Sequence, residues 1–174
     1  MGTSRTRASY LLLLLPFIYV QIFYGLGTLG LVGPDEPRYA EVSKEMLRNG
    51  DYVTPRLSGE PWFEKPILYY WITTLSFHLF GLNESAARLA SALAAVLGIL
   101  AVVLVGYDWI GLRGGVNAAL ILSSCILYFS LARAASTDML LTGTLTAAWA
   151  GFYFVLFPTE KFTGSSGLAG EARS

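Results

Sequence analysis

Charged side chains are absent from four long stretches of the chain, and these stretches dominate its pattern. The uncharged windows are residues 8–34, 89–107, 114–132 and 139–159. A helix needs roughly 20 predominantly apolar residues to cross the hydrocarbon core of a membrane. The pattern therefore predicts an all-α membrane protein with about four transmembrane helices. They are expected near residues 10–32, 89–107, 114–133 and 138–157.

Residues 66–83 form a fifth uncharged window, and its length alone would permit a fifth span. Three hydroxyl residues and His78 interrupt this window, and a Tyr-Tyr-Trp cluster lies near its start. We therefore expect a second, partly embedded juxtamembrane helix over 67–80 instead of a span. His78 is expected to be a hydrogen-bonded helix residue and not a metal ligand.

The segment between the first two predicted spans begins with a change of pattern. Asp35 and Glu36 precede Pro37, as is typical of a first helical turn. Apolar positions then recur on one side until Gly50 supplies a stop. This predicts a short amphipathic helix over 37–49 in the first loop, suited to the membrane surface. A solvated surface helix with ion pairs along its length would show the same pattern.

The composition agrees with a membrane protein. Hydrophobic residues make up 54 % of the chain and charged residues 14 %, against about a quarter charged in an average soluble domain. The formal net charge is zero, so no basic face indicates nucleic acid as a partner. Cys125 is the single cysteine, which excludes an intramolecular disulfide and a cysteine-based zinc site.

Both ends of the chain carry further signals. Two arginines precede the leucine run at the N-terminus, as in a signal peptide, but the apolar run continues to Val32 without a small-residue cleavage site. We expect an uncleaved first span. Glycine and serine are frequent after residue 160, which favours a flexible tail over 160–174 behind a transmembrane module over 1–159.

Half of the charged side chains, 12 of 24, lie between Asp35 and Lys65. Charges at a membrane edge are costly and tend to be functional. With four spans the chain crosses twice between this loop and Asp138, so Asp35, Glu64 and Asp138 are expected on the same side. Counting basic residues, seven on the loop side against five, does not decide which side that is.

Several motifs together resemble a known family. In chain order they are Asp35-Glu36-Pro37-Arg38-Tyr39-Ala40, Pro55-Arg56-Leu57, Trp62-Phe63-Glu64-Lys65-Pro66 and Ser136-Thr137-Asp138. This set resembles the N-terminal part of GT-C class membrane glycosyltransferases, in particular the group of aminoarabinose transferases and protein O-mannosyltransferases. The similarity covers roughly residues 8–157 and implies two juxtamembrane helices in the first loop.

The resemblance also implies a chemistry. Such enzymes transfer a sugar from a polyprenyl-phosphate carrier to a glycolipid or protein acceptor, with inversion, at the outer face of the membrane. For a bacterial protein this is the inner membrane, with the active-site loop in the periplasm. Asp35 then matches the general base, worth about 10²–10⁴ in rate, with Glu64 and Asp138 as further acids of the site. Arg38 and Lys65 match positions that bind the carrier phosphate.

Alternatives remain open for individual residues and for the whole chain. The resemblance allows a divalent metal ion, with Asp35 and Glu64 as candidate ligands, whereas Glu64-Lys65 alone could be an ordinary surface pair. The family module has more spans than this chain, so a truncated, non-catalytic protein or an assembly partner is the alternative to an enzyme. A transporter is disfavoured, because the charges lie at the ends of the predicted spans.

Overall fold

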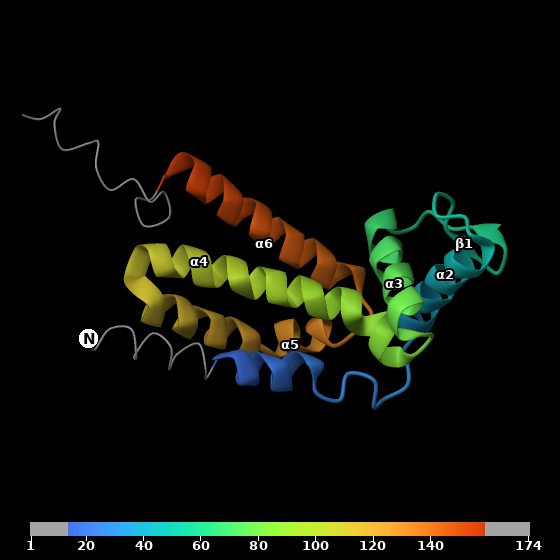
Figure 1. Cartoon of the computed structure of the whole chain (residues 1–174), viewed down its shortest axis with the longest axis horizontal. Helices are drawn as coiled ribbons and strands as arrows, with labels where there is room; N and C mark the ends of the chain where they lie inside the picture. The colour runs from blue at the N-terminus through green and yellow to red at the C-terminus, as the bar shows by residue number, and fades with distance from the viewer. Residues whose placement is uncertain (1–13, 159–174) are drawn as a thin grey trace, which may run out of the picture.

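The computed structural model describes residues 14–158. The predictions for residues 1–13 and for a flexible tail over 160–174 fall outside this range. Within it, nearly all regular structure is helical (Figure 1). The elements are η1 (Tyr19–Phe23), α2 (Asp35–Asn49), β1 (Arg56–Leu57), β2 (Glu60–Pro61), α3 (Ile67–Phe80), α4 (Glu84–Ser124), α5 (Ile126–Ala132) and α6 (Thr137–Leu156).

The helix α4 is a hairpin of two helices and not one straight rod. Gly111 has φ of 80° and ψ of 177° inside it, a conformation that a residue without Cβ adopts readily. The chain therefore reverses at Gly111, and the second arm continues after a break at Cys125 into α5. These arms occupy the second and third predicted spans. By length and hydropathy, α4 and α6 are the described helices able to cross a membrane.

Small residues let these helices approach closely. A Cβ built on Gly143 of α6 would lie 2.2 Å from the Ala94 carbonyl oxygen of α4, and one on Gly106 would lie 2.7 Å from the Gly115 Cα. Such contacts are typical of helix pairs in membranes, where small residues permit backbone packing. These contacts bring α6 and the second arm of α4 close against the first arm of α4.

The two predicted juxtamembrane helices are confirmed as α2 and α3. They lie together at one end of the bundle, and α3 runs across the direction of α4 and α6 (Figure 1). Its 14 residues span about 21 Å at 1.5 Å per residue, less than the roughly 30 Å of the hydrocarbon core. A short β1–β2 hairpin closes the loop between them.

The first predicted span ends earlier than expected, and this boundary was wrong. The helix that is described from Leu14 ends at Phe23 as a π-helix, not near residue 32. Gly25 has φ of +66°, and the turns that follow direct backbone carbonyl groups toward Arg88 instead of into a helical ladder. Continuous hydropathy did not reveal this change of backbone partners.

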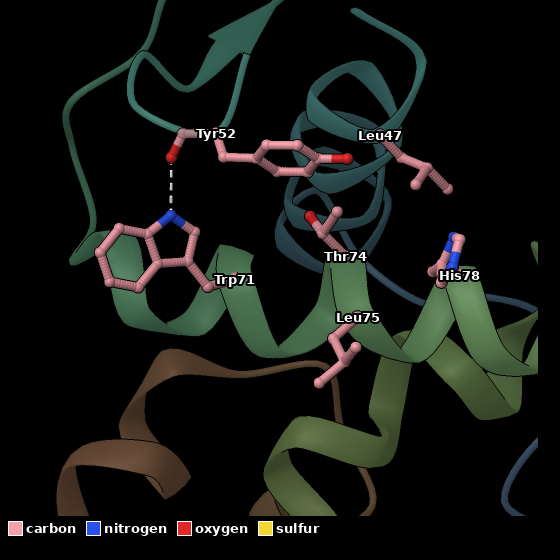
Figure 2. A pocket seen from close by; sticks show the side chains of 6 residues that line it. All are labelled: Leu47, Tyr52, Trp71, Thr74, Leu75 and His78. Atoms are coloured by element: carbon pink, nitrogen blue, oxygen red, sulfur yellow. Dashed lines mark hydrogen bonds between the residues drawn. The ribbon is translucent and has the colours of Figure 1, made fainter. Parts of the chain in front are cut away.

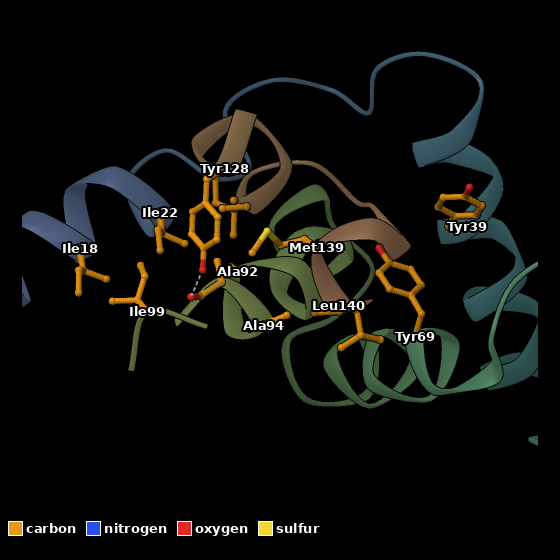
Figure 3. Close-up of a cluster of buried hydrophobic side chains, with 14 of the residues drawn as sticks. Ile18, Ile22, Tyr39, Tyr69, Ala92, Ala94, Ile99, Tyr128, Met139 and Leu140 are labelled. Atoms are coloured by element: carbon orange, nitrogen blue, oxygen red, sulfur yellow. Dashed lines mark hydrogen bonds between the residues drawn. The ribbon is translucent and has the colours of Figure 1, made fainter. Parts of the chain in front are cut away.

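A common core joins the bundle to the two short helices. Ile18 and Ile22 pack near Tyr128, whose hydroxyl donates to the Ala95 carbonyl at 2.6 Å, while Tyr39 and Tyr69 continue the cluster toward α2 and α3 (Figure 3). The rings of Tyr39 and Tyr69 meet edge to face with centroids 5.8 Å apart. The surface loop is therefore anchored to the transmembrane part by buried side chains.

Candidate functional site

Asp35 is the first residue of α2, at the end of the bundle where α2 and α3 lie. Negative charge is favourable in a first helical turn, and Pro34 sets the entry of the chain. The Asp35 side chain is 62 % exposed and accepts a hydrogen bond from Arg38 Nη1 at 3.3 Å. Arg38 in turn lies over the ring of Trp62, 5.4 Å from its centroid. The carboxylate is thus accessible and has a cation beside it.

Lys65 precedes α3 and faces the same helix start. Its Nζ lies 5.8 Å from the centroid of the Tyr39 ring. The Tyr39 hydroxyl raises the pKa of the Lys65 ammonium group above its ordinary value, and the charges of Asp138 and Asp35 add to this. Because the pKa is raised, Lys65 carries its positive charge throughout the neutral range.

Asp138 lies in the first turn of α6, and its side chain is exposed. Ser136 caps this helix, since its hydroxyl accepts the Asp138 backbone N–H at 3.1 Å. The helix α6 starts at the end of the bundle that carries α2 and α3 (Figure 1), and Asp138 is its second residue. The charges of Asp35 and Asp138 both help to raise the pKa of Lys65, so all three residues belong to one electrostatic neighbourhood.

Glu64 is less closely associated with the charged group of Asp35, Lys65 and Asp138. Its side chain is exposed, and its charge acts on the buried hydroxyl of Tyr70. It lies next to Lys65 in the chain, so it is at the edge of the same charged group. That Asp35, Glu64 and Asp138 are acids of one site stays a prediction.

The most strongly bonded charges in this region are Glu36 and Arg88. Glu36 Oε1 accepts from Arg88 Nε at 3.1 Å, and Oε2 accepts from Arg88 Nη2 at 2.9 Å. Both side chains are buried. Burial alone would raise the pKa of Glu36, but hydrogen bonds from Arg88, Val32 and Ala135 outweigh it, so the pKa is lowered. Glu36 is therefore ionised at neutral pH.

The sequence motifs did not assign a role to the pair of Glu36 and Arg88. A signal was present, because Arg88 is a lone cation beside the alanine-rich start of a predicted span. Ionisable residues in such places are paired in nearly all cases. The partner could not be chosen from the sequence, since Glu36 is 52 residues away and Asp35 lies next to it.

Within residues 14–158, no group of three or more His, Cys, Asp and Glu side chains could hold a divalent metal ion. Asp35, a candidate ligand, is paired with Arg38, and Lys65 is nearby. Cations in these positions oppose the binding of a second cation.

A pocket of about 410 Å³ lies on another part of this region, between α2 and α3 (Figure 2). The side chains that line it are Leu47, Tyr52, Trp71, Thr74, Leu75 and His78. Trp71 Nε1 donates to the Tyr52 carbonyl at 2.6 Å across one end. This pocket contains none of the predicted charged site residues.

Comparisons with known proteins agree with this architecture. The family model described as dolichyl-phosphate-mannose-protein mannosyltransferase matches residues 64–167, more than half of the chain. The undecaprenyl phosphate-alpha-4-amino-4-deoxy-L-arabinose arabinosyl transferase of Serratia proteamaculans is 35 % identical over 154 residues, covering 88 % of this chain and 28 % of the relative. A corresponding transferase of Sodalis glossinidius is 40 % identical over 126 residues, covering 69 % of this chain and 22 % of the relative.

Solved structures match as well. The crystal structure of ArnT from Cupriavidus metallidurans in the apo state has a TM-score of 0.82 at 36 % identity, covering 87 % of this chain and 28 % of that one. The same protein bound to undecaprenyl phosphate also has a TM-score of 0.82 at 36 % identity, covering 86 % and 28 %. The chain thus spans about a quarter of the length of the relatives and solved structures that it matches.

The expected fold class and family are confirmed by these matches: the chain is an all-α membrane protein that corresponds to part of a GT-C module. On the family model that covers more than half of it, the chain belongs to the family of membrane glycosyltransferases described as dolichyl-phosphate-mannose-protein mannosyltransferases.

Proposed function

We propose that this chain forms the part of a polyprenyl-phosphate-dependent glycosyltransferase that holds the donor phosphate and the reacting carboxylates. The proposal is carried by the charged group at the start of α2, where Arg38 Nη1 lies 3.3 Å from the Asp35 carboxylate and Lys65 Nζ lies 5.8 Å from the Tyr39 ring centroid. The charges of Asp35 and Asp138 both act on Lys65. Support comes from the relatives, whose names specify undecaprenyl phosphate-linked aminoarabinose. One structural neighbour is described as bound to undecaprenyl phosphate.

The proposed reaction is a displacement at the anomeric carbon of the sugar. An acceptor oxygen forms the new bond to this carbon, and the bond from the carbon to the phosphate oxygen breaks with its electron pair. Asp35 takes the acceptor proton as general base. Lys65 and Arg38 stabilise the negative charge that develops on the departing polyprenyl phosphate. Glu64 and Asp138 complete the acidic side of the site.

We propose an undecaprenyl-phosphate pentose as donor, by analogy with the named relatives, and a glycolipid of the lipid A class as acceptor. Donor and acceptor lipids are both held in a membrane, which suits a site built from two surface helices. The proposed location is the bacterial inner membrane with the 35–65 loop in the periplasm. A lipid carrier would reach this loop without leaving the bilayer.

The test is sugar transfer by a hybrid transferase, in which this chain replaces the matching part of the Cupriavidus metallidurans protein. Labelled aminoarabinose on undecaprenyl phosphate is supplied in nanodiscs with lipid A as acceptor. We expect transfer above that of a hybrid carrying Asp35→Asn. A hybrid that binds the donor and performs no transfer would support the alternative, a non-catalytic relative that keeps the fold.

A further inference from the structure

Glu36 joins three parts of the chain that are far apart in sequence. Each of its oxygens accepts one N–H from Arg88 and one from the backbone. Oε1 accepts the Ala135 N–H at 2.6 Å, and Oε2 accepts the Val32 N–H at 2.6 Å. The carboxylate therefore ties the start of α2, together with the turn just before it, to α4 and to the loop before α6.

Arg88 completes this arrangement with five hydrogen bonds, one for each N–H of its guanidinium group. Besides the two to Glu36, it donates to the carbonyl groups of Leu26, Leu29 and Gly30, each at 2.8 Å. Buried polar groups that are fully bonded have one favoured arrangement. The turn that leads into Asp35 is fixed by these contacts.

The loop before α6 has a second anchor. Ser91 Oγ accepts the Ser136 N–H at 3.0 Å and donates to the Ser136 carbonyl at 3.0 Å. Ser136 caps α6 and so sets the position of Asp138. Asp35 is covalently next to Glu36, and Asp138 follows Ala135 by three residues. The placement of both exposed acids thus depends on one buried carboxylate.

We propose that Glu36, supported by Ser91, is a positioning residue that holds Asp138 in register with Asp35 and Lys65. The inference rests on the proposed function. It gives Glu36 a role apart from that of its neighbour Asp35, although both belong to the same motif. The Glu36 carboxylate already accepts four hydrogen bonds within the protein, and in this role it acts through the backbone N–H of Ala135.

The first measurement uses the chain itself, in nanodiscs, with hydrogen exchange followed by mass spectrometry. Glu36→Asp keeps the charge that Arg88 needs but is one methylene shorter, so it cannot reach Arg88 and both backbone N–H groups. We expect exchange in residues 133–138 to rise about tenfold or more, as for the loss of one hydrogen bond to a charged group. Glu41→Asp, the same change on the same helix, is the control and should leave this segment unchanged.

The second measurement is a double-mutant cycle on kcat and donor KM in the hybrid transferase, with Asp138→Asn as the partner change. Misplacement of a reacting group can cost up to about 10²-fold. We expect Glu36→Asp to lower kcat about tenfold or more with donor KM within about twofold. In the Asp138→Asn background it should lower kcat less than about twofold, because the positioned group is already absent.

Ser91→Ala supplies a second variant that removes only a hydroxyl from the loop. It should lower kcat by a smaller factor, and this effect should also disappear with Asp138→Asn. If Glu36→Asp prevents folding, the double-mutant cycle of Ser91→Ala with Asp138→Asn tests the inference in its place. A merely structural role would lower kcat by equal factors in both backgrounds.

The outcomes separate this inference from the function on which it rests. A loss of kcat in Asp138→Asn without coupling to Glu36 or Ser91 overturns the inference alone. Unchanged exchange in residues 133–138 of Glu36→Asp overturns it too. Wild-type kcat in Asp138→Asn contradicts the role proposed for Asp138 and removes the inference with it. A hybrid without any transfer contradicts the proposed function.

Discussion

Asp35 and Glu36 are neighbours in the chain, yet their environments are opposite. The Asp35 side chain is 62 % exposed, with one hydrogen bond from Arg38, whereas that of Glu36 is 9 % exposed. Two N–H groups of Arg88 and two of the backbone bind Glu36. One helical turn thus presents one acid to the membrane surface and buries the other.

This difference separates two requirements of a site. A buried carboxylate with all its bonding positions occupied has nothing left to offer a substrate, but it fixes the backbone around it. An exposed carboxylate with one partner can exchange that partner for a substrate proton. The comparison therefore supports the proposed roles, in which Glu36 fixes the backbone and Asp35 takes part in the chemistry, and both roles can be tested at each residue.

The largest effect is expected at the exposed acid. Asp35→Asn keeps the size of the side chain and much of its hydrogen bonding but removes the base. In the hybrid transferase, turnover should fall by about 10²–10⁴ while donor binding stays near wild type. Sugar transfer and donor binding are measured separately. Glu60→Gln, an exposed acid of the β1–β2 hairpin, is the control, and near-normal turnover in Asp35→Asn would transfer the role of base to Glu64.

The buried pair should dominate stability. Arg88→Met leaves the Glu36 carboxylate without its cation and three backbone carbonyls without donors, which should cost about 3–5 kcal/mol of unfolding free energy. Denaturant unfolding of the chain in detergent micelles measures this. Arg48→Met, at an exposed position on α2, should change stability little. Equal losses in the two variants would show that the Glu36–Arg88 pair is not special.

Lowering the pH should weaken the hydrogen bonds of the buried Glu36 carboxylate before it alters the rest of the fold. The folded-state pKa of Glu36 is lowered, so its contribution to stability is present above the ordinary value near 4.5 and is lost as pH falls through the folded value. Wild-type stability should therefore decrease more below pH 4.5 than that of Glu36→Gln. The pKa of Asp51 is also lowered. Because Asp51 is present in both proteins, its contribution to the pH dependence of stability cancels in the comparison. Parallel pH curves would contradict this assignment.

The smallest effect is expected at an exposed ion pair on the same helix. Lys44 Nζ lies 2.6 Å from Glu41 Oε2, and both side chains are partly exposed. Exposed pairs of this kind contribute about 0.3–0.5 kcal/mol. Lys44→Ala should change unfolding free energy by no more than this and leave sugar transfer unchanged. A loss comparable to that in Arg88→Met would mean that burial does not distinguish the two pairs.

Local patterns predicted much of this molecule. Long uncharged windows located three of the helical segments of the bundle, and the acid-then-proline start and Gly50 bounded α2 correctly to within two residues. The polar residues in the fifth uncharged window indicated correctly that α3 is a juxtamembrane helix and not a transmembrane span. These features depend on hydropathy and on local backbone preferences, which a single sequence contains.

Long-range bonding was not predictable in the same way. The first helix ends at Phe23 because carbonyl groups further on bind Arg88, about 60 residues away. The partnership of Arg88 with Glu36 instead of Asp35 depends on which side of the α2 start faces the bundle. Motifs identified the exposed acids by resemblance, but only the packed structure distinguishes the exposed acid Asp35 from the buried acid Glu36.

Binding of the carrier phosphate at Lys65 tests the account most directly. Undecaprenyl phosphate binding to the hybrid transferase in nanodiscs is compared for wild type, Lys65→Ala and Lys44→Ala. A hydrogen bond to a charged group is worth about 1.5–3 kcal/mol, so Lys65→Ala should weaken binding about 10- to 100-fold while Lys44→Ala binds as wild type. Unchanged binding in Lys65→Ala, or equal weakening in both variants, would contradict a phosphate site at this end of the bundle.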